Sequence, residues 1–390
     1  MVFHLSFPHH PFLYKFIEPF EKNFPGNNKV LLITNSTNEN NYCEIPSELV
    51  LYKGNSKEEI IDIINKNVNI GVCVYWLNED IIDIVNNIKP SVKIYFRSYG
   101  PDIKPLLYCP KIIIKRETRK LIENPYLTFL KQFMRSLKSI VTADNIGEQS
   151  GINDLKTFLL RVNALGTVTN QEYIQLKTLL PELTENRFTV RMYDSSLEQP
   201  FPYRDKYKII VGHSGYAINN HVDVYKELSK FKLSDSYKVY SILSYGNKEY
   251  IEKVISAGKK LLKNSFIPIT QYHPIEQYYS MIDECNVLIM NNVIQQGGGN
   301  VIRFLMNGGK VYLDENNPIY IDRKNDGYII FSVQKDLTLE HLTDHQLTLE
   351  EKIKNRELMI SETRIDEDVI ELTRFLTEDR TLYNAITAIK

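Results

Sequence analysis

Short apolar runs of β-forming residues alternate with amphipathic helical patterns along this chain, and the whole alternation occurs twice. Parallel strands need a crossover between them, usually a helix, so this alternation predicts a parallel sheet with helices on both faces. In the first half we predict strands at 2–6, 29–34, 49–53, 70–75, 92–97 and 139–142, and helices at 57–65, 79–88 and 118–138.

The same rhythm restarts after residue 207. Pro200 and Pro202 lie in the segment between the two halves, where they would end elements, so 194–206 is the predicted linker. We therefore predict two Rossmann-like doubly wound α/β domains that face each other across a cleft, where such sheets bind ligands. This arrangement resembles the glycosyltransferase B type, which some epimerases and binding proteins share. In the second half we predict strands at 208–211, 238–243, 286–290, 310–313 and 328–332, and helices at 219–231, 248–262, 274–284 and 300–306.

Composition limits the class of protein. A chain of 390 residues is long enough for two cores, and 47 basic against 48 acidic side chains do not favour nucleic-acid binding. The four cysteines show no CxxC spacing, which fits a reducing compartment and not a zinc site. The sequence has no long apolar run and no signal-peptide pattern, so we expect a cytoplasmic protein.

A glycine-containing turn follows the strand at 208–211. The sequence Gly212-His213-Ser214-Gly215 leads into a helical pattern, and small residues in this position leave backbone N–H groups free for an anion. Asn219 or Asn220 suits an N-cap, and His221 in the first helical turn would donate to a phosphate oxygen. A tight turn without a ligand is the alternative.

A second glycine cluster, Gln295-Gln296-Gly297-Gly298-Gly299-Asn300, precedes the helix at 300–306. Three consecutive glycines destabilise a helix start, so we favour a binding role over a flexible loop. Gln295, Gln296 and Asn300 add amide donors and acceptors. Two such loops predict a diphosphate bound from two sides. Further candidates are Asn317, in the turn after 310–313, and Glu276, for which helix capping is the simpler account.

Two side chains of the first half are candidates for a general base, which a sugar transfer with inversion needs to deprotonate the acceptor hydroxyl. Asp102 follows the strand at 92–97, so we expect it at the cleft, although a turn aspartate is a common alternative. His10 lies in the loop after the first strand. His9 and His10 have no carboxylate or cysteine partner at ligand spacing, so no metal site is predicted.

Residues 115–138 hold seven Lys or Arg against two Glu, interleaved with apolar and aromatic side chains. This composition suits an anionic membrane surface, and a solvated helix face is an equal alternative. Pro125 would split the stretch into two helices. The membrane-facing candidates are Lys115, Arg116, Lys131, Arg135 and Lys138.

These motifs together resemble a known family. The Gly-His-Ser-Gly turn with its Asn-Asn-His, the Gln-Gln-Gly-Gly-Gly-Asn cluster and the turn Glu315-Asn316-Asn317-Pro318 are similar to motifs of bacterial 4-acetamido-4,6-dideoxygalactose (N-acetylfucosamine) transferases of enterobacterial common antigen synthesis, glycosyltransferase family 56. The resemblance is strongest over 207–330. In the first half, Pro8-His9-His10 and Gly100-Pro101-Asp102 also resemble family elements, whereas Tyr75-Trp76 and Ser98-Tyr99 depart from them.

The resemblance implies an inverting, metal-independent transferase without a cofactor, acting at the cytoplasmic face of the inner membrane. It would move a deoxyamino sugar from a dTDP-sugar to a polyprenyl-diphosphate-linked saccharide. Residues 1–193 would then bind the acceptor and 207–337 the donor, followed by a helical segment at 338–390. By this mapping Asp102 is the base with His10 in reserve, and the donor contacts are Gly212, Ser214, Gly215, His221, Gln296, Gly297, Gly299 and Asn300, with Asn317 nearby. The alternatives are a sugar-nucleotide epimerase of the same fold and a non-catalytic sugar-binding protein.

Overall fold

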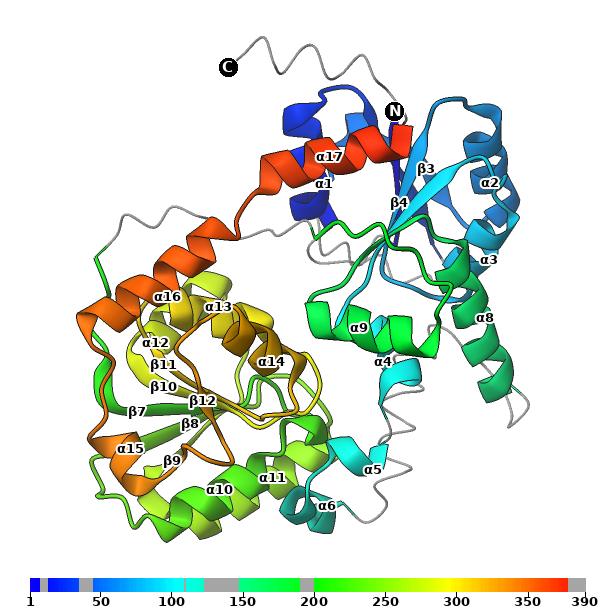
Figure 1. Cartoon of the computed structure of the whole chain (residues 1–390). Helices are drawn as coiled ribbons and strands as arrows, with labels where there is room; N and C mark the ends of the chain where they lie inside the picture. The colour runs from blue at the N-terminus through cyan, green and yellow to red at the C-terminus, as the bar shows by residue number, and fades with distance from the viewer. Residues whose placement is uncertain (8–12, 35–44, 109, 123–146, 190–199, 378–390) are drawn as a thin grey trace.

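The computed structural model describes residues 1–7, 13–34, 45–108, 110–122, 147–189 and 200–377. They form two six-stranded sheets, in each of which all strand pairs are parallel. Figure 1 shows the two α/β units, one above the other. The predicted fold class, two doubly wound α/β domains, is confirmed.

Both sheets have the same strand order. The first runs β3-β2-β1-β4-β5-β6 and the second β12-β11-β10-β7-β8-β9, so in each the strand order reverses beside its first strand. Ligands of open α/β sheets bind at the carboxyl ends of the strands beside this switch point. The strands are β1 Val2–Ser6, β2 Asn28–Ile33, β3 Val50–Gly54, β4 Gly71–Tyr75, β5 Lys93–Arg97, β6 Ala164–Gly166, β7 Asp205–Val211, β8 Lys238–Ile242, β9 Phe266–Ile269, β10 Cys285–Met290, β11 Lys310–Leu313 and β12 Phe331–Ser332.

Helices cover both faces of each sheet and bury their apolar sides against it. Side-chain caps fix several helix starts, such as Ser56 at α2, Asn78 at α3 and Asn247 at α11. The longer helices are α1 Leu13–Asn23, α2 Lys57–Lys66, α3 Glu79–Asn87, α4 Gly100–Leu107, α8 Gly147–Arg161, α9 Asn170–Leu179, α10 His221–Lys230, α11 Lys248–Leu262, α12 Ile275–Asp283, α13 Gly298–Met306, α14 Pro318–Asn325, α16 Leu349–Ser361 and α17 Ile365–Thr377. Short helices are α5 Pro110–Ile113, α6 Arg116–Leu121 and α15 Leu339–Thr343, with 3₁₀ turns at Ser47–Leu49, Ala217–Asn219 and Lys263–Ser265.

Two edge strands were missed by the sequence prediction. β6 has only three residues, too few for a recognisable alternation, and β9 contains Pro268, which disfavours a strand assignment. The strand predicted at 139–142 and most of the helix predicted at 118–138 lie outside the described residues.

Two segments pack on the domain that their sequence position does not suggest. The first is α17. The preceding helix, α16, packs on α13 of the second domain, but α17 returns to the first domain and lies against α1, β4 and β5 (Figure 1). Conversely, α5 and α6 belong to the first half of the sequence but lie beside α10 and α11 of the second domain. Among the described residues, no helix is both long and apolar enough to cross a membrane.

Candidate active site

The two glycine loops lie at the switch point of the second sheet. β7 and β10 are neighbours, and the first loop follows β7 while the second follows β10. The backbone N–H of Gly212 donates to the carbonyl of Ile289 in β10 at 3.0 Å, which ties the first loop to the neighbouring strand. The structure therefore brings the two predicted glycine clusters together at one sheet edge.

The first loop is held together from within. Gly212 has φ +73°, a left-handed conformation that favours glycine. Asn219 is buried beneath the loop, where its Oδ1 accepts from the backbone N–H of His213 at 3.1 Å and its Nδ2 donates to Ser214 Oγ at 3.0 Å. The backbone N–H of Gly215 donates to the carbonyl of Tyr245 at 2.7 Å, which joins this loop to the one after β8. Asn219 thus shapes the loop, and the other predicted candidate, Asn220, occupies the N-cap position of α10.

His221 supports this loop from below. It is fully buried, its Nδ1 lies 3.1 Å from the hydroxyl of Tyr250, and its Nε2 packs against Gly212. Burial lowers the pKa of His221 to about 3, so the ring is neutral at pH 7. The structure therefore corrects the predicted contact between His221 and a phosphate oxygen, because the first glycine loop covers the side chain.

The second loop contacts the first through Gly297, whose φ is +64°. A Cβ atom at this position would lie 2.8 Å from Cγ of His213 and 2.5 Å from Cε of Met290. Gly297 is also the N-cap of α13, and it leaves the helix start without a side-chain cap. A Cβ at Gly299 would meet nothing within 4 Å, so open space lies beside the first turn of α13. Free N–H groups at an open helix start form an anion site.

The amide side chains of this loop have different surroundings. Asn300 is buried and exchanges hydrogen bonds with the hydroxyl of Tyr278, at 2.9 and 2.7 Å. Gln296 is half-buried, and its Oε1 has no hydrogen-bond partner among the described residues. The side chain of Gln295 contacts Gly100 of the first domain, since a Cβ at Gly100 would lie 2.6 Å from its Oε1. Gln295 therefore joins the start of α4, the helix that carries Asp102, to the second glycine loop.

The side chains of Asn317 and Glu276 have different surroundings. Asn317 is fully buried, caps α14 through Ile319, and donates to the carbonyls of Asn292 and Ile294 at 2.7 and 3.2 Å. Its side chain supports the second glycine loop instead of contacting a donor directly, which corrects that expectation. Glu276 is exposed in the first turn of α12, as the capping alternative would place it.

Asp102 uses its carboxylate to shape the backbone. It is 3 % exposed, and its two oxygens accept from the backbone N–H groups of Tyr99 at 2.8 Å and Leu77 at 3.3 Å. Burial raises its pKa to about 7, although both hydrogen bonds act against the rise. Both oxygens of the carboxylate are occupied by backbone N–H groups, so the alternative of a turn aspartate describes Asp102 better than a general base. His10 lies outside the described residues.

A second buried carboxyl group, Glu172, lies at the carboxyl end of the neighbouring strand β6. It is 1 % exposed; its Oε2 accepts from the hydroxyl and the N–H of Thr169, and its Oε1 has no hydrogen-bond partner among the described residues. Burial raises its pKa to about 7. Thr169 also lines a hollow that Gly298 and Ile319 border from the second domain. Glu172 was missed because Thr169-x-x-Glu172 indicates an ordinary capping box, and a local pattern does not reveal that the carboxyl group is buried.

Lys104 on α4 completes a charged cluster between the domains. Burial lowers its pKa to about 8, and the charges of Glu172 and Asp102 act in the opposite direction. Burial of His213 and, to a smaller extent, the positive charge of Lys104 lower the pKa of His213 to about 4. Groups that perturb one another in this way are typical of functional sites.

The predicted membrane-facing residues have different surroundings in the structure. Lys115 is not directed to a membrane, because it forms an ion pair with Asp314, a fully buried residue of the second domain. The side chain of Arg116 is 84 % exposed. Lys131, Arg135 and Lys138 lie outside the described residues. Within the described ranges, no three His, Cys, Asp or Glu side chains are grouped as a metal site.

A protein-family model described as 4-alpha-L-fucosyltransferase, glycosyl transferase group 56, matches this chain. It matches residues 165–362, slightly more than half of the chain. The matched region contains both glycine loops, Glu172 and the whole second sheet.

Solved structures similar to this chain share its fold at low identity. The N-terminal domain of Candida albicans trehalose-6-phosphate phosphatase is 9 % identical, with a TM-score of 0.59 over 97 % of this chain and 94 % of that one. A glycosyltransferase from Rickettsia africae is 12 % identical, with a TM-score of 0.59 over 97 % and 98 %. A trehalose-6-phosphate protein from E. coli, bound with UDP-2-fluoro glucose, is 9 % identical, with a TM-score of 0.59 over 97 % and 99 %. These similarities show the glycosyltransferase B fold.

Proposed function

Because this chain belongs to the glycosyltransferase group 56 family and is a glycosyltransferase, we propose that it transfers a deoxyamino sugar from a dTDP-sugar to a polyprenyl-diphosphate-linked saccharide. The sugar would resemble 4-acetamido-4,6-dideoxygalactose. The description of the family names a fucosyltransferase, and fucose is also a 6-deoxyhexose. The activity class rests on the family, and the donor and acceptor are our proposal.

One observation supports the donor site above all others: the uncapped N-terminus of α13 lies at the switch point, beside open space at Gly299. When the sugar leaves, negative charge develops on the nucleoside diphosphate. Backbone N–H groups and the positive end of a helix dipole stabilise this charge. Fixed dipoles can stabilise the leaving group without a metal ion, so we propose metal-independent transfer, which EDTA should leave unchanged.

We place the general base at Glu172 and not at Asp102. Both carboxyl groups have a pKa raised to about 7, but only Glu172 has an oxygen without a hydrogen-bond partner among the described residues. The hydroxyl of Thr169 fixes the other oxygen. An ionised Glu172 would accept the proton of the acceptor hydroxyl as that oxygen attacks the anomeric carbon and the diphosphate leaves. Access to Glu172 requires the acceptor to enter the hollow between the domains.

The activity test combines a radiolabelled dTDP-deoxyamino sugar with a polyprenyl-diphosphate-linked saccharide and the purified protein. Label that moves into the organic phase together with release of dTDP is the expected result. Conversion of the dTDP-sugar into an isomer, without labelled lipid, would contradict the proposal and favour an epimerase. UDP-sugars serve as the control for the nucleotide base.

We further propose that the protein binds the cytoplasmic face of the inner membrane through the basic stretch 115–138, apart from Lys115. Reversing the charges of Lys131, Arg135 and Lys138 together should weaken binding to anionic vesicles at low salt, because the attraction is electrostatic and screened by salt. Unchanged vesicle binding would favour a solvated helix face.

A further inference from the structure

Residues 110–122, which comprise α5 and α6 and which we call the strap, are built into the second domain. Ile113, Ile114 and Ile122 are buried in the same apolar cluster as β7 and β10. Asp223 of α10 caps α6, since its carboxylate accepts from the backbone N–H groups of Glu117 and Thr118, both at 2.9 Å. The strap is therefore a fixed part of the domain that carries the glycine loops.

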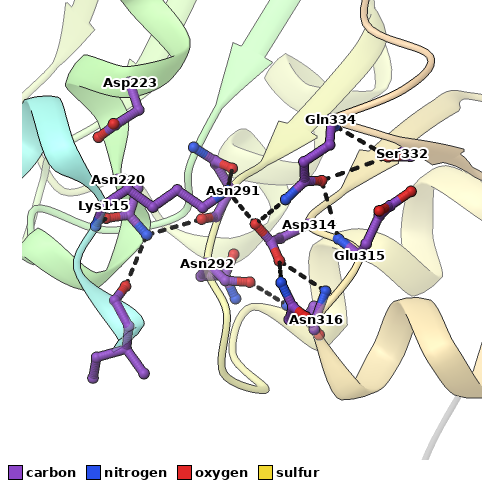
Figure 2. A network of polar contacts seen from close by, with 12 residues as sticks. Lys115, Asn220, Asp223, Asn291, Asn292, Asp314, Glu315, Asn316, Ser332 and Gln334 are labelled. Atoms are coloured by element: carbon purple, nitrogen blue, oxygen red, sulfur yellow. Dashed lines mark hydrogen bonds and ion pairs between the residues drawn. The ribbon is translucent and has the colours of Figure 1, made fainter. Parts of the chain in front are cut away.

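The strap places Lys115 at the carboxyl edge of the second sheet (Figure 2). Its backbone N–H donates to Oδ1 of Asn220 at 2.8 Å, directly after the first glycine loop. Its ammonium group donates to Oδ1 of Asn291, which follows β10, and forms an ion pair with Asp314, which follows β11. Lys115 thus lies where the adjacent strands β10 and β11 end, beside the start of α10, the helix that follows β7.

Asp314 explains why a cation is needed here. Its side chain is 0 % exposed, and it also accepts hydrogen bonds from Gln334 and from the backbone and side chain of Asn316. A buried carboxylate destabilises a protein strongly unless a positive charge compensates it. The pair with Lys115 provides that compensation and fixes the position of the ammonium group.

Among the described residues, the partners of the ammonium group leave one donor for a ligand. A lysine ammonium has three N–H donors, of which Asn291 and Asp314 use two, and the side chain of Lys115 remains 24 % exposed. The loop that starts at Asn291 folds back through Asn292, whose Nδ2 donates to the carbonyls of Ile294 at 2.7 Å and Gln296 at 3.5 Å. This folding keeps the start of α13 close to the strand end that Lys115 contacts.

We propose that Lys115 is a donor-binding residue, supplied by the strap, whose free N–H contacts the diphosphate of the nucleotide sugar. The inference rests on the donor site proposed above and adds to it a cation from the other half of the sequence. Asp314 acts as a positioning residue, because it holds the ammonium group and does not itself contact the ligand.

The test measures binding of dTDP and of inorganic pyrophosphate by calorimetry, together with thermal unfolding, for K115M, for the double variant K115M/D314N and for K120M. Lys120 is the matched control, since it lies on the same strap, is 56 % exposed and pairs with Glu117. We expect K115M to bind dTDP at least tenfold more weakly and to unfold at a lower temperature, because Asp314 is left buried without a counter-ion. The double variant should regain the unfolding temperature but not the affinity. K120M should match the wild type in both.

Recovery of wild-type dTDP affinity in the double variant would overturn the inference and leave Lys115 a purely structural partner of Asp314. Equal affinity of K115M and the wild type would do the same, and neither result would affect the proposed function. If the wild type binds neither dTDP nor pyrophosphate, the donor site itself fails, and the inference fails with it.

Discussion

The imidazole ring of His213 lies against the Cα atom of Gly297, so the two glycine loops of the second domain are in direct contact. The contact joins a loop after β7 to a loop after β10, far apart in sequence. Because Gly297 is also the N-cap of α13, we expect a side chain at this point to displace the helix start that we assign to the diphosphate.

Substitution by alanine should destabilise the protein at Gly297 and have little effect on its stability at Gly299. Gly297→Ala forces a Cβ into a left-handed residue and against His213 and Met290, so we expect a loss of about 2 kcal/mol or more in stability. Gly299→Ala meets no neighbour and should change stability by less than about 1 kcal/mol.

The Gly299→Ala variant also tests the donor site. Its methyl group would occupy the open space beside the helix start, so we expect dTDP affinity to fall about tenfold while the fold remains intact. Urea unfolding and calorimetry measure the two quantities separately. Unchanged dTDP binding by Gly299→Ala would place the diphosphate elsewhere.

Glu172→Gln should reduce turnover by roughly 100-fold or more, because the amide retains the cap on Thr169 but cannot accept a proton. Wild-type turnover should rise with pH and level off above about 7, where Glu172 is ionised. Asp102→Asn is the matched control: it should lower stability through weaker contacts with Tyr99 and Leu77 and leave turnover of the folded protein largely intact. The reverse pattern would return the role of base to Asp102.

Glu172 should also make stability depend on pH. Its pKa in the folded protein, about 7, lies above the ordinary value of 4.5, so between these pH values the native state binds more protons than the unfolded state. Ionisation therefore destabilises the fold as pH rises through this window, by about 3 kcal/mol in total. Relative to the wild type, Glu172→Gln should gain stability from pH 5 to pH 8, measured by urea unfolding. A constant difference between the two proteins would show that the pKa of Glu172 is not raised.

Asp322 of α14 should hold the domains together. Its carboxylate accepts from the backbone N–H groups of Asn170 at 2.5 Å and Gln171 at 3.1 Å, and so caps α9 of the other domain. Asp322→Asn removes the negative charge from this helix N-terminus, an effect of about 1 kcal/mol. We expect a larger radius of gyration in solution scattering. Asp326→Asn, a neutralisation at the end of the same helix, is the control, and an equal change in both variants would contradict the specific role of Asp322.

The sequence by itself determined the elements of the fold. Alternating apolar runs and helical patterns identified the strands that flank both switch points, because periodicity is a local property that each segment carries alone. The same reasoning located the two glycine loops at strand ends. It failed at β6 and β9, where three residues or an internal proline give no periodic signal.

Only the tertiary structure decided the roles of individual polar side chains. Whether a carboxyl group is a cap or a candidate base depends on which atoms surround it, and these come from segments distant in sequence. Asp102 and Glu172 are both acids near helix starts, yet packing of the described residues leaves one oxygen of Glu172, and none of Asp102, without a hydrogen-bond partner. Lys115 belongs to a basic stretch that suggested a membrane surface, and the return of the strap to the second domain places it instead on a buried carboxylate. Burial and long-range pairing are set by the assembled fold, so no local pattern could indicate them.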